Sequence, residues 1–382
     1  MKRSYCGLII VLFWVFSCRN KQRVGTIVAK EEITIPTNSI DQAKFSEIFD
    51  SVEYIPLRSG YFTDLRKIRI HNNHIYISST TPAVLWRYSM DGILVDSLYR
   101  QGHGPGEYSN IRDFDIADNG DLYILSRTEK MILIYDNNLY PKHQFTIPVF
   151  ATGIEILSKN QVMLYCANEN ILTGDQVIIF DWGQSTIKSG YFPMDMEQRT
   201  FINVIDRQNF FERNDTLYFT RGFDNTIYRK MNAEINPWLT VNFGENNLPQ
   251  SFLDAEYENV MDFYETIRKT DFAFRIIGWT MSDDFALFNF EMSNQFYLAV
   301  VDFENDQSKV YEILEDDMQF LGSQFKNLVE IGPYAVDKNG YFYFFINAGS
   351  VELKIPTQAM VNGQKESSYH TNSYILRCRL KK

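Results

Sequence analysis

The sequence predicts an all-β fold, a six-bladed β-propeller of four-stranded antiparallel blades with a helical insertion near residues 251–268. Three observations predict it: an aromatic-rich composition, one hairpin pattern that recurs six times, and a helical spacing of apolar residues confined to a single segment. The 382 residues are 45% hydrophobic and 15% aromatic. Such a chain can bury a large core, and aromatic residues favour the pleated, half-buried surface of a strand.

In the recurring pattern, a turn rich in Asn, Asp and Gly leads at once into an apolar, aromatic strand. The six copies are residues 72–77, 119–124, 159–164, 214–219, 283–288 and 339–344. Asn, Asp and Gly tolerate the positive φ that tight hairpins require. A second hairpin follows in most units, and four short strands per unit are typical of a propeller blade, whereas a sandwich or barrel would not repeat one unit six times. The predicted blades are 64–101, 109–149, 150–194, 203–244, 272–315 and 333–382.

The remaining elements lie before, between and within these units. Residues 33–35 and 52–57 are predicted strands, and the second is expected to supply the outer strand of the last blade and close the ring. A short helix is expected around Lys44–Phe49. Between blades four and five, residues 251–268 have apolar side chains at helical spacing, and Ser251 with Asp254 resembles a capping box. Residues 347–371 form a second expected insertion, inside the last blade.

The N-terminus has the features of a lipoprotein signal peptide. Lys2 and Arg3 precede an apolar run, Gly7–Phe16, that is too short to span a bilayer as a mature helix, and Ser17 and Cys18 follow. This ending resembles a bacterial lipobox, although Phe16 stands where a small residue is usual. The resemblance implies acyl chains on Cys18. The alternative is a short apolar N-terminus buried in the fold.

The predicted organisation is a signal peptide over residues 1–17, a lipidated tether over 18–32 and a propeller domain over 33–382. The membrane is therefore an expected partner through Cys18. Residues 19–22 lack the acidic residues that often accompany surface export. We therefore expect a lipid anchor in the bacterial cell envelope, in the outer membrane and facing the periplasm, with exposure on the cell surface left open.

Charge and cysteine content exclude several classes of function. The net charge is −11, and removal of residues 1–17 takes away two basic residues and makes the chain more acidic. An acidic surface argues against a nucleic-acid partner. Cys166 and Cys378 lie in different repeats, so two buried free thiols are expected, although a disulfide stays possible. No zinc-ligand spacing occurs, and neither a metal nor a cofactor is predicted.

A family resemblance rests on two segments. Gly102–Tyr108, with the sequence GHGPGEY, and the following Ile111–Asp115 resemble the GxGPGE signature of a bacterial family of six-bladed propeller lipoproteins, distantly similar to NHL-repeat propellers. Residues 49–57 are similar to the segment with which that family begins its propeller. The resemblance implies the fold and an envelope location. It implies no established activity, so it supplies no catalytic residues.

Candidate ligand-binding residues lie in loops on one face of the expected ring. His103 and Glu107 in the glycine-rich loop are the best acid–base candidates on that face. The alternative for this loop is a fixed turn that joins blades one and two. Arg127 and Arg221 follow the second strands of blades two and four and could bind a carboxylate or sulfate. Asp224 lies close to Arg221 in the sequence, so a local salt bridge is an equally good interpretation.

An acid-rich stretch, residues 113–121, is a candidate calcium site because it offers several oxygen ligands at close spacing. The full EF-hand pattern is missing, and only Asp113 and Asp115 would point to the same side of a strand. The preferred interpretation is a turn flanked by solvated strand residues.

Two hypotheses about function follow. In the first, the protein is a binding or scaffold module of the cell envelope whose loop face holds a peptide, a glycan or a protein partner. In the second, it is a polysaccharide lyase or hydrolase with its site on the same face, built from His103, Glu107, Arg127 and Arg221. No nucleophile motif such as GxSxG occurs in the sequence, so no catalytic residue is assigned and the first hypothesis is preferred.

Overall fold

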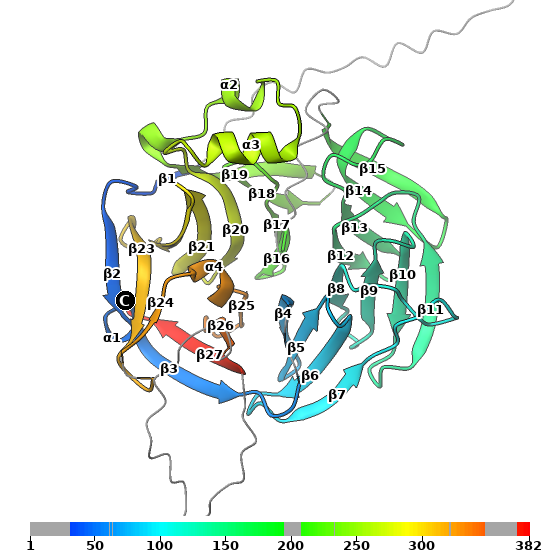
Figure 1. Ribbon diagram of the computed structural model, residues 1–382. Helices are drawn as coiled ribbons and strands as arrows, with labels where there is room; N and C mark the ends of the chain where they lie inside the picture. Colours follow the sequence, from blue (N-terminus) through cyan, green and yellow to red (C-terminus); the bar gives the residue numbers. More distant parts are fainter. Residues whose placement is uncertain are drawn as a thin grey trace, which may run out of the picture.

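Six β-sheets stand around a central channel in the computed structural model (Figure 1). The structure describes residues 31–382 except 61, 63, 195–207, 233, 321 and 348–372. The predicted signal peptide, Cys18 and the insertion at 347–371 therefore lie wholly or almost wholly outside the described residues. Within each sheet, the four strands of the blade lie side by side and are antiparallel, and they follow the sequence order from the channel outward except where N-terminal strands join blades four, five and six. The predicted fold class, a six-bladed propeller of four-stranded blades, is confirmed.

Among the described residues, each of the first three blades contains the four strands that the sequence pattern predicts and no more. Blade one contains β4 (Leu65–His71), β5 (His74–Ser79), β6 (Val84–Ser89) and β7 (Leu94–Leu98). Blade two contains β8 (Asp113–Ile116), β9 (Leu122–Ser126), β10 (Met131–Tyr135) and β11 (Pro141–Thr146). Blade three contains β12 (Gly153–Ser158), β13 (Gln161–Tyr165), β14 (Asp175–Asp181) and β15 (Thr186–Pro193).

The next two blades each add an outer strand from the N-terminal segment. Blade four contains β16 (Phe210–Arg213), β17 (Thr216–Phe219), β18 (Thr226–Met231) and β19 (Glu234–Asn242), with β1 (Glu31–Thr34) parallel to β19. Blade five contains β20 (Phe274–Met281), β21 (Phe285–Met292), β22 (Gln295–Asp302) and β23 (Gln307–Asp316), with β2 (Ile40–Lys44) parallel to β23 and β24 (Ser323–Phe325) antiparallel to it. Both additions extend a blade beyond the four strands expected.

Blade six joins the two ends of the chain. It contains β25 (Ala335–Val336), β26 (Phe342–Asn347), β27 (Ser373–Leu380) and, as its outer strand, β3 (Phe49–Pro56). Ile375 pairs with Ile55 in this antiparallel ladder. The expected closure of the ring by the N-terminal strand is confirmed, and it places the outer edge of β27 in a ladder instead of in solvent.

The hydrophobic core is divided into separate layers between neighbouring blades. Six clusters of buried side chains each draw their members from two adjacent blades, as between blades four and five, where Phe211 and Leu239 meet Trp279 and Phe288. This explains why the strands have nearly continuous apolar sequences, because both faces of every inner strand are covered. Cys166 and Cys378 are buried free thiols in two of these layers, as expected.

The helical insertion is interrupted, unlike the single helix expected over residues 251–268. It consists of η1 (Gly244–Asn246), α2 (Gln250–Leu253) and α3 (Val260–Ile267). The helix α3 begins after Asn259, whose Oδ1 accepts hydrogen bonds from the backbone N–H groups of Met261 and Asp262 at 2.8 and 3.2 Å. The predicted capping box at Ser251 and Asp254 is therefore not the start of the main helix. Tyr257 lies between the two helices and donates a hydrogen bond to the carbonyl of Phe252.

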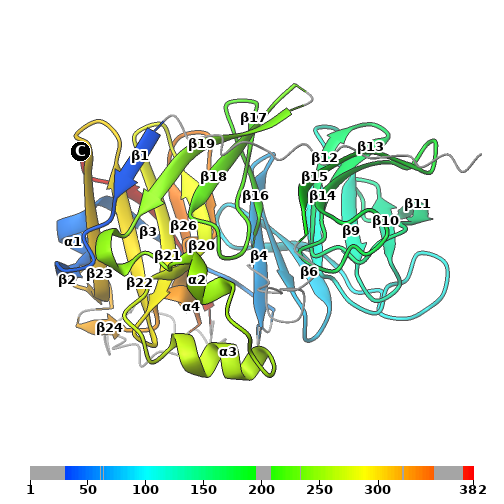
Figure 2. The ribbon, with the colours of Figure 1, turned by 90° about the horizontal axis from the view of Figure 1, so that it is seen from above.

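The other short helices are α1 (Phe45–Ile48), which matches the expected helix near residues 44–49, and α4 (Leu328–Ile331). No helix in the described ranges is long and apolar enough to cross a membrane. The ring has two different faces, seen edge-on in Figure 2. We call one the turn face, because it carries the hairpin turns between first and second strands, such as Asn72–Asn73 and Asn214–Asp215. The other, the loop face, carries the connections between blades and the insertion with α3.

Candidate functional site: the central channel

The channel is lined by the first strand of every blade, and each of these strands contacts the next around the ring. A cavity of about 980 Å³ occupies the half of the channel nearer the turn face. Its lining includes seven carboxylates and five basic side chains, drawn from all six blades. A large, polar, concave site of this kind is where a propeller would be expected to bind a ligand.

The part of the channel nearer the loop face contains a closed ion pair between Lys67 on β4 and Asp113 on β8. The Lys67 Nζ lies 2.7 Å from Asp113 Oδ1 and also donates to the carbonyl of Phe114 at 2.8 Å. The other carboxylate oxygen accepts the backbone N–H of Ile154 on β12 at 2.9 Å. Both residues are buried, at 2% and 4% exposure, and neither lines the cavity. We call this the Lys67 pair; its polar groups are satisfied within three adjacent blades.

One step nearer the turn face, a second cluster forms the floor of the cavity. Arg69 on β4 lies 2.6 Å from Asp115 on β8 and 3.0 Å from Glu155 on β12, both nitrogen–oxygen distances. Asp115 also accepts the backbone N–H of Ile156 at 2.8 Å. Glu212 on β16 faces the same group of charges. We call Arg69, Asp115, Glu155 and Glu212 the Arg69 cluster.

The Arg69 cluster contains more carboxylates than cations, and the repulsion between these carboxylates contributes to the raised pKa values of Glu155 and Glu212. Burial and then the negative charge of Asp115 raise the pKa of Glu155 to about 8, although Arg69 opposes the shift. The same two carboxylates raise the pKa of Arg69 despite its burial, so the guanidinium keeps its charge. Glu155 therefore holds a proton at neutral pH unless another cation comes near.

Glu212 is the member of the cluster that is open to the cavity. Its side chain is exposed and makes no hydrogen bond or ion pair with any described residue. Desolvation against the channel wall raises its pKa; Arg69 opposes this shift, whereas Asp115 and Asp118 add to it. His71 lies nearby in the cavity wall, where burial lowers its pKa and its Nε2 has no hydrogen-bond partner among the described residues. The cavity thus offers a free carboxylate and an unpartnered imidazole nitrogen.

The loop-face residues predicted from the sequence are largely engaged by other parts of the chain. Arg221 contacts Asp224 through two nitrogens, with its Nε 2.6 Å from Asp224 Oδ2, which confirms the local salt bridge proposed as an alternative. Its guanidinium also lies 4.7 Å from the centre of the Phe192 ring. Arg127 forms an ion pair with Glu169 of blade three.

His103 and Glu107 belong to the loop that joins blades one and two. Within the described part of the chain, neither makes a hydrogen bond or ion pair with Arg127 or Arg221. The Glu107 Oε2 accepts the backbone N–H of Gly104 at 2.8 Å, and a Cβ on Gly102 would lie 2.1 Å from that oxygen. The loop is therefore a fixed turn between blades, held by its own glutamate. The His103 side chain is 82% exposed and has one weak contact, 3.8 Å to Glu129.

At the loop-face end of the channel lies Arg112, which the sequence reasoning did not single out. Its Nε and Nη2 are buried and make no hydrogen bond with any described residue. Burial and the nearby positive charge of Arg66 lower the pKa of Arg112 to about 9, which still leaves it charged at neutral pH. The two ends of the channel therefore differ in sign, with excess cation near the loop face and excess carboxylate near the turn face.

The interpretation of residues 113–121 needs correction. Asp113 and Asp115 are each 4% exposed and bind Lys67 and Arg69, so they are not solvated strand residues. Sequence reasoning missed the channel residues because it searched the loops. The signal was present as charges two positions apart, Lys67 with Arg69 and Asp113 with Asp115, on strands that are otherwise apolar. Side chains two apart on a strand share a face, and only the channel face of an inner strand can hold them.

Two examples illustrate the solved structures that share the fold. The first is the structure of a Bacteroides fragilis protein described as a predicted exported protein. Its TM-score is 0.71 at 14% sequence identity, and the match covers 92% of this chain and 99% of that one. The second is from a member of the DUF4221 family in Bacteroides vulgatus, with a TM-score of 0.53 at 10% identity, covering 87% and 97%. No curated protein matches the sequence.

At such identities these two structures show the fold alone. The family comes from a separate comparison, in which a model described as a domain of unknown function, DUF4934, matches residues 30–366. That range includes the N-terminal strands, all of the first five blades and most of the sixth. The chain therefore belongs to the DUF4934 family.

Proposed function

We propose that the protein is a binding module whose central channel takes up, from the turn face, a ligand that carries an ammonium or guanidinium group. The observation that carries the proposal is the Arg69 cluster, where Arg69 pairs with Asp115 and Glu155, and a third carboxylate, Glu212, lines the same cavity of about 980 Å³. A second cation beside Glu212 would balance these charges.

Such binding would depend on pH in a defined direction. The raised pKa of Glu155 means that the cluster holds a proton that an incoming cation displaces, and the pKa of Glu212 is raised in the same direction. Binding should therefore release protons, and affinity should rise with pH up to about 8. A ligand without a cationic group would not show this dependence.

Isothermal titration calorimetry with the capped tripeptide Gly-Lys-Gly tests the proposal, with Gly-norleucine-Gly as the uncharged probe of matched shape. We expect the lysine peptide to bind at least about fivefold more tightly at pH 8 than at pH 6, and the norleucine peptide not to bind. Glu212→Gln should weaken binding about tenfold. The matched control is Glu245→Gln, an exposed glutamate in η1 outside the cavity. Equal affinity of both peptides, or of wild type and Glu212→Gln, would contradict the proposal.

An enzyme is the second candidate, and the burial of Glu155 beside Asp115, which raises its pKa to about 8, favours it. A carboxylic acid that keeps its proton at neutral pH is what general-acid cleavage of a glycosidic bond requires. The site would then lie at the turn-face end of the channel instead of among the loop-face residues. Release of new chain ends from envelope polysaccharides should fall at least about a hundredfold in Glu155→Gln. Absence of turnover by the wild type would remove this candidate.

We further propose that the module is anchored by acyl chains on Cys18 in the bacterial outer membrane and faces the periplasm. The basic start, the short apolar run and the cysteine of the N-terminus support this, as does the predicted export of a protein with the same fold. Labelling of cells with a palmitate analogue should mark the wild type but not Cys18→Ser. Protease added to intact cells should leave the protein uncut if it faces the periplasm, whereas cleavage would place it on the cell surface.

A further inference from the structure

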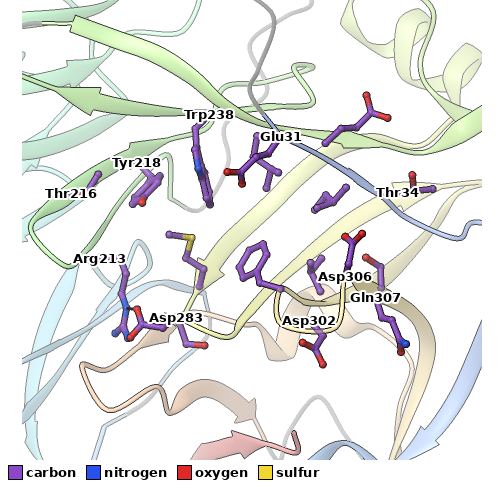
Figure 3. Close-up of a pocket in the computed structure, with 18 of the residues that line it drawn as sticks. Glu31, Thr34, Arg213, Thr216, Tyr218, Trp238, Asp283, Asp302, Asp306 and Gln307 are labelled. Atoms are coloured by element: carbon purple, nitrogen blue, oxygen red, sulfur yellow. Dashed lines mark hydrogen bonds and ion pairs between the residues drawn. The ribbon is translucent and has the colours of Figure 1, made fainter.

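A groove of about 760 Å³ runs between blades four and five on the turn face (Figure 3). One wall is β1 with the outer part of β19, and the other consists of the turns of blade five after β20 and after β22. Arg213, Asn214 and Met281 line both this groove and the channel cavity, so the two adjoin at these residues. A ligand in the channel could therefore extend into the groove.

Aromatic side chains form the inner wall of the groove. The ring centroids of Trp238 and Tyr218 are 4.9 Å apart in an edge-to-face arrangement. The ring centroid of Phe303 lies 6.4 Å from that of Trp238. All three are only partly buried, so part of each ring borders the groove. The face of an indole or phenol ring attracts a cation.

The charges around these rings have one sign. Five carboxylates line the groove, against one basic side chain, Arg213. That arginine is already neutralised by Asp283, at a nitrogen–oxygen distance of 2.9 Å. The carboxylates are Glu31, Glu32, Asp283, Asp302 and Asp306.

Two of the five carboxylates are free to bind a ligand. Asp302 accepts hydrogen bonds from the backbone of its own turn, and Glu32 accepts one from Asn242 at 2.9 Å. Glu31 and Asp306 make no hydrogen bond or ion pair with any described residue. In Figure 3 the Glu31 carboxylate lies next to the Trp238 ring, and Asp306 lies across the groove near Thr34. A ring face beside an unpaired carboxylate is an arrangement suited to a lysine or arginine side chain.

The shape of the rim favours a peptide as the carrier of that side chain. The strand β1 is the last strand of its sheet and pairs only with β19 among the described residues. All four of its residues line the groove. An extended peptide can pair with such an edge while its side chains enter the adjacent pocket.

We propose that the groove binds a second basic side chain of a peptide whose first basic side chain occupies the channel. The inference rests on the proposed function for the channel and specifies its ligand as a peptide with two lysine or arginine residues. The ring of Trp238 would cover the alkyl stem and the charge, and Glu31 would form the ion pair.

Calorimetry on the mature protein with capped peptides tests this inference. One probe has two lysines separated by a glycine-serine spacer, and a second has the outer lysine replaced by norleucine. We expect the two-lysine peptide to bind at least about tenfold more tightly. Trp238→Leu and Glu31→Gln should each remove about five- to tenfold of that gain, and added salt should weaken it. Glu31 is exposed, so its variant tests the groove without disturbing the core.

The matched control is Glu304→Gln, which removes one exposed carboxylate from the turn after β22 but lies outside the groove. Its affinity should stay within about twofold of wild type. Unchanged affinity in both Trp238→Leu and Glu31→Gln would overturn the inference, as would equal binding of the two peptides.

The experiments distinguish a wrong inference about the groove from a wrong proposal about the channel. If Glu212→Gln weakens binding of both peptides and the groove variants weaken neither, the channel proposal stands and the groove inference is wrong. If the groove variants weaken binding of the two-lysine peptide while Glu212→Gln has no effect, the channel proposal is wrong and the inference of one peptide across both sites fails with it.

Discussion

The Lys67 pair and the Arg69 cluster both use β4 and β8, at positions two residues apart, yet they differ in which charges they leave unsatisfied. In the Lys67 pair one cation meets one carboxylate, and backbone groups of blades two and three complete the bonding. In the Arg69 cluster one cation contacts two carboxylates, and a third carboxylate, Glu212, lines the same cavity with no partner among the described residues. The first arrangement fixes blades to each other, whereas the second leaves a charge for something else to bind.

The comparison teaches that burial of charge is not by itself a sign of function in a propeller channel. Both groups are built from residues at alternate positions of β4 and β8, and both join neighbouring blades. What distinguishes them is whether the charges balance and whether a cavity reaches them. Four substitutions can break or sharpen this distinction.

The largest effect is expected from Lys67→Met, which leaves the Asp113 carboxylate buried without its cation. We expect it to lower the free energy of unfolding by about 3–5 kcal/mol, measured by urea denaturation. The control is Lys142→Met, which breaks the more exposed ion pair with Asp121 and should cost less than about 1 kcal/mol. Similar losses in the two variants would show that the Lys67 pair has no special structural role.

The next effect concerns the pH dependence of stability. Since burial raises the folded pKa of Glu155 from 4.5 to about 8, the folded state holds a proton that the unfolded state releases. Its contribution is fully present below pH 4.5 and is lost as the pH rises towards 8. We expect the free energy of unfolding of the wild type to fall by roughly 2–4 kcal/mol over this range relative to Glu155→Gln, which cannot titrate. Parallel stability curves for the two proteins would contradict the raised pKa.

A smaller effect of opposite sign is expected at the loop-face end. Arg112→Met removes a guanidinium whose Nε and Nη2 are buried without hydrogen-bond partners among the described residues, while its methylene stem is largely kept. We expect it to raise the free energy of unfolding by about 1–3 kcal/mol, measured by urea denaturation. Sulfate should also stabilise the wild type more than it stabilises the variant. A loss of stability instead would mean that Arg112 is compensated within the fold.

The smallest effect is expected from His103→Ala. The side chain is 82% exposed and has one contact at 3.8 Å, so its loss should change the free energy of unfolding by less than about 0.5 kcal/mol. If channel binding is the function, peptide affinity should also stay unchanged. A marked loss of binding would move the site to the loop face, where the sequence first suggested it.

The sequence predicted the fold far better than the site. Each blade can be recognised from a short stretch of sequence, because an Asn, Asp or Gly turn is followed directly by a strand. Asn72 and Asn73, both with positive φ, form one such turn. The closure of blade six by a strand at residues 52–57 was also predicted, since the last repeat lacks an outer strand of its own, and the structure has this strand at Phe49–Pro56. The interrupted insertion was not, because the apolar spacing continues through residues 254–259, where the chain leaves the helix.

The site escaped prediction because its members are far apart in the sequence. Arg69, Asp115, Glu155 and Glu212 come from four different blades, and each alone is a charged residue on a short strand. The local sequence could assign Glu107 to a loop. It could not show that the Glu107 carboxylate accepts a hydrogen bond from the backbone N–H of Gly104.

By itself, the sequence determined the repeat, the strand order within each blade, the free buried thiols and the acidic charge, because hairpins and apolar periodicity are properties of neighbouring residues. Only the tertiary structure decided which charges are satisfied. Lys67 lies next to Asp113, and Arg69 next to several carboxylates, only after the six inner strands have closed into a ring. The same closure places β1 and Trp238 in the wall of one groove. The pKa of an ionisable group and the energy of its ion pairs depend on its burial and on nearby charges. In a closed ring, both are set by residues from other blades.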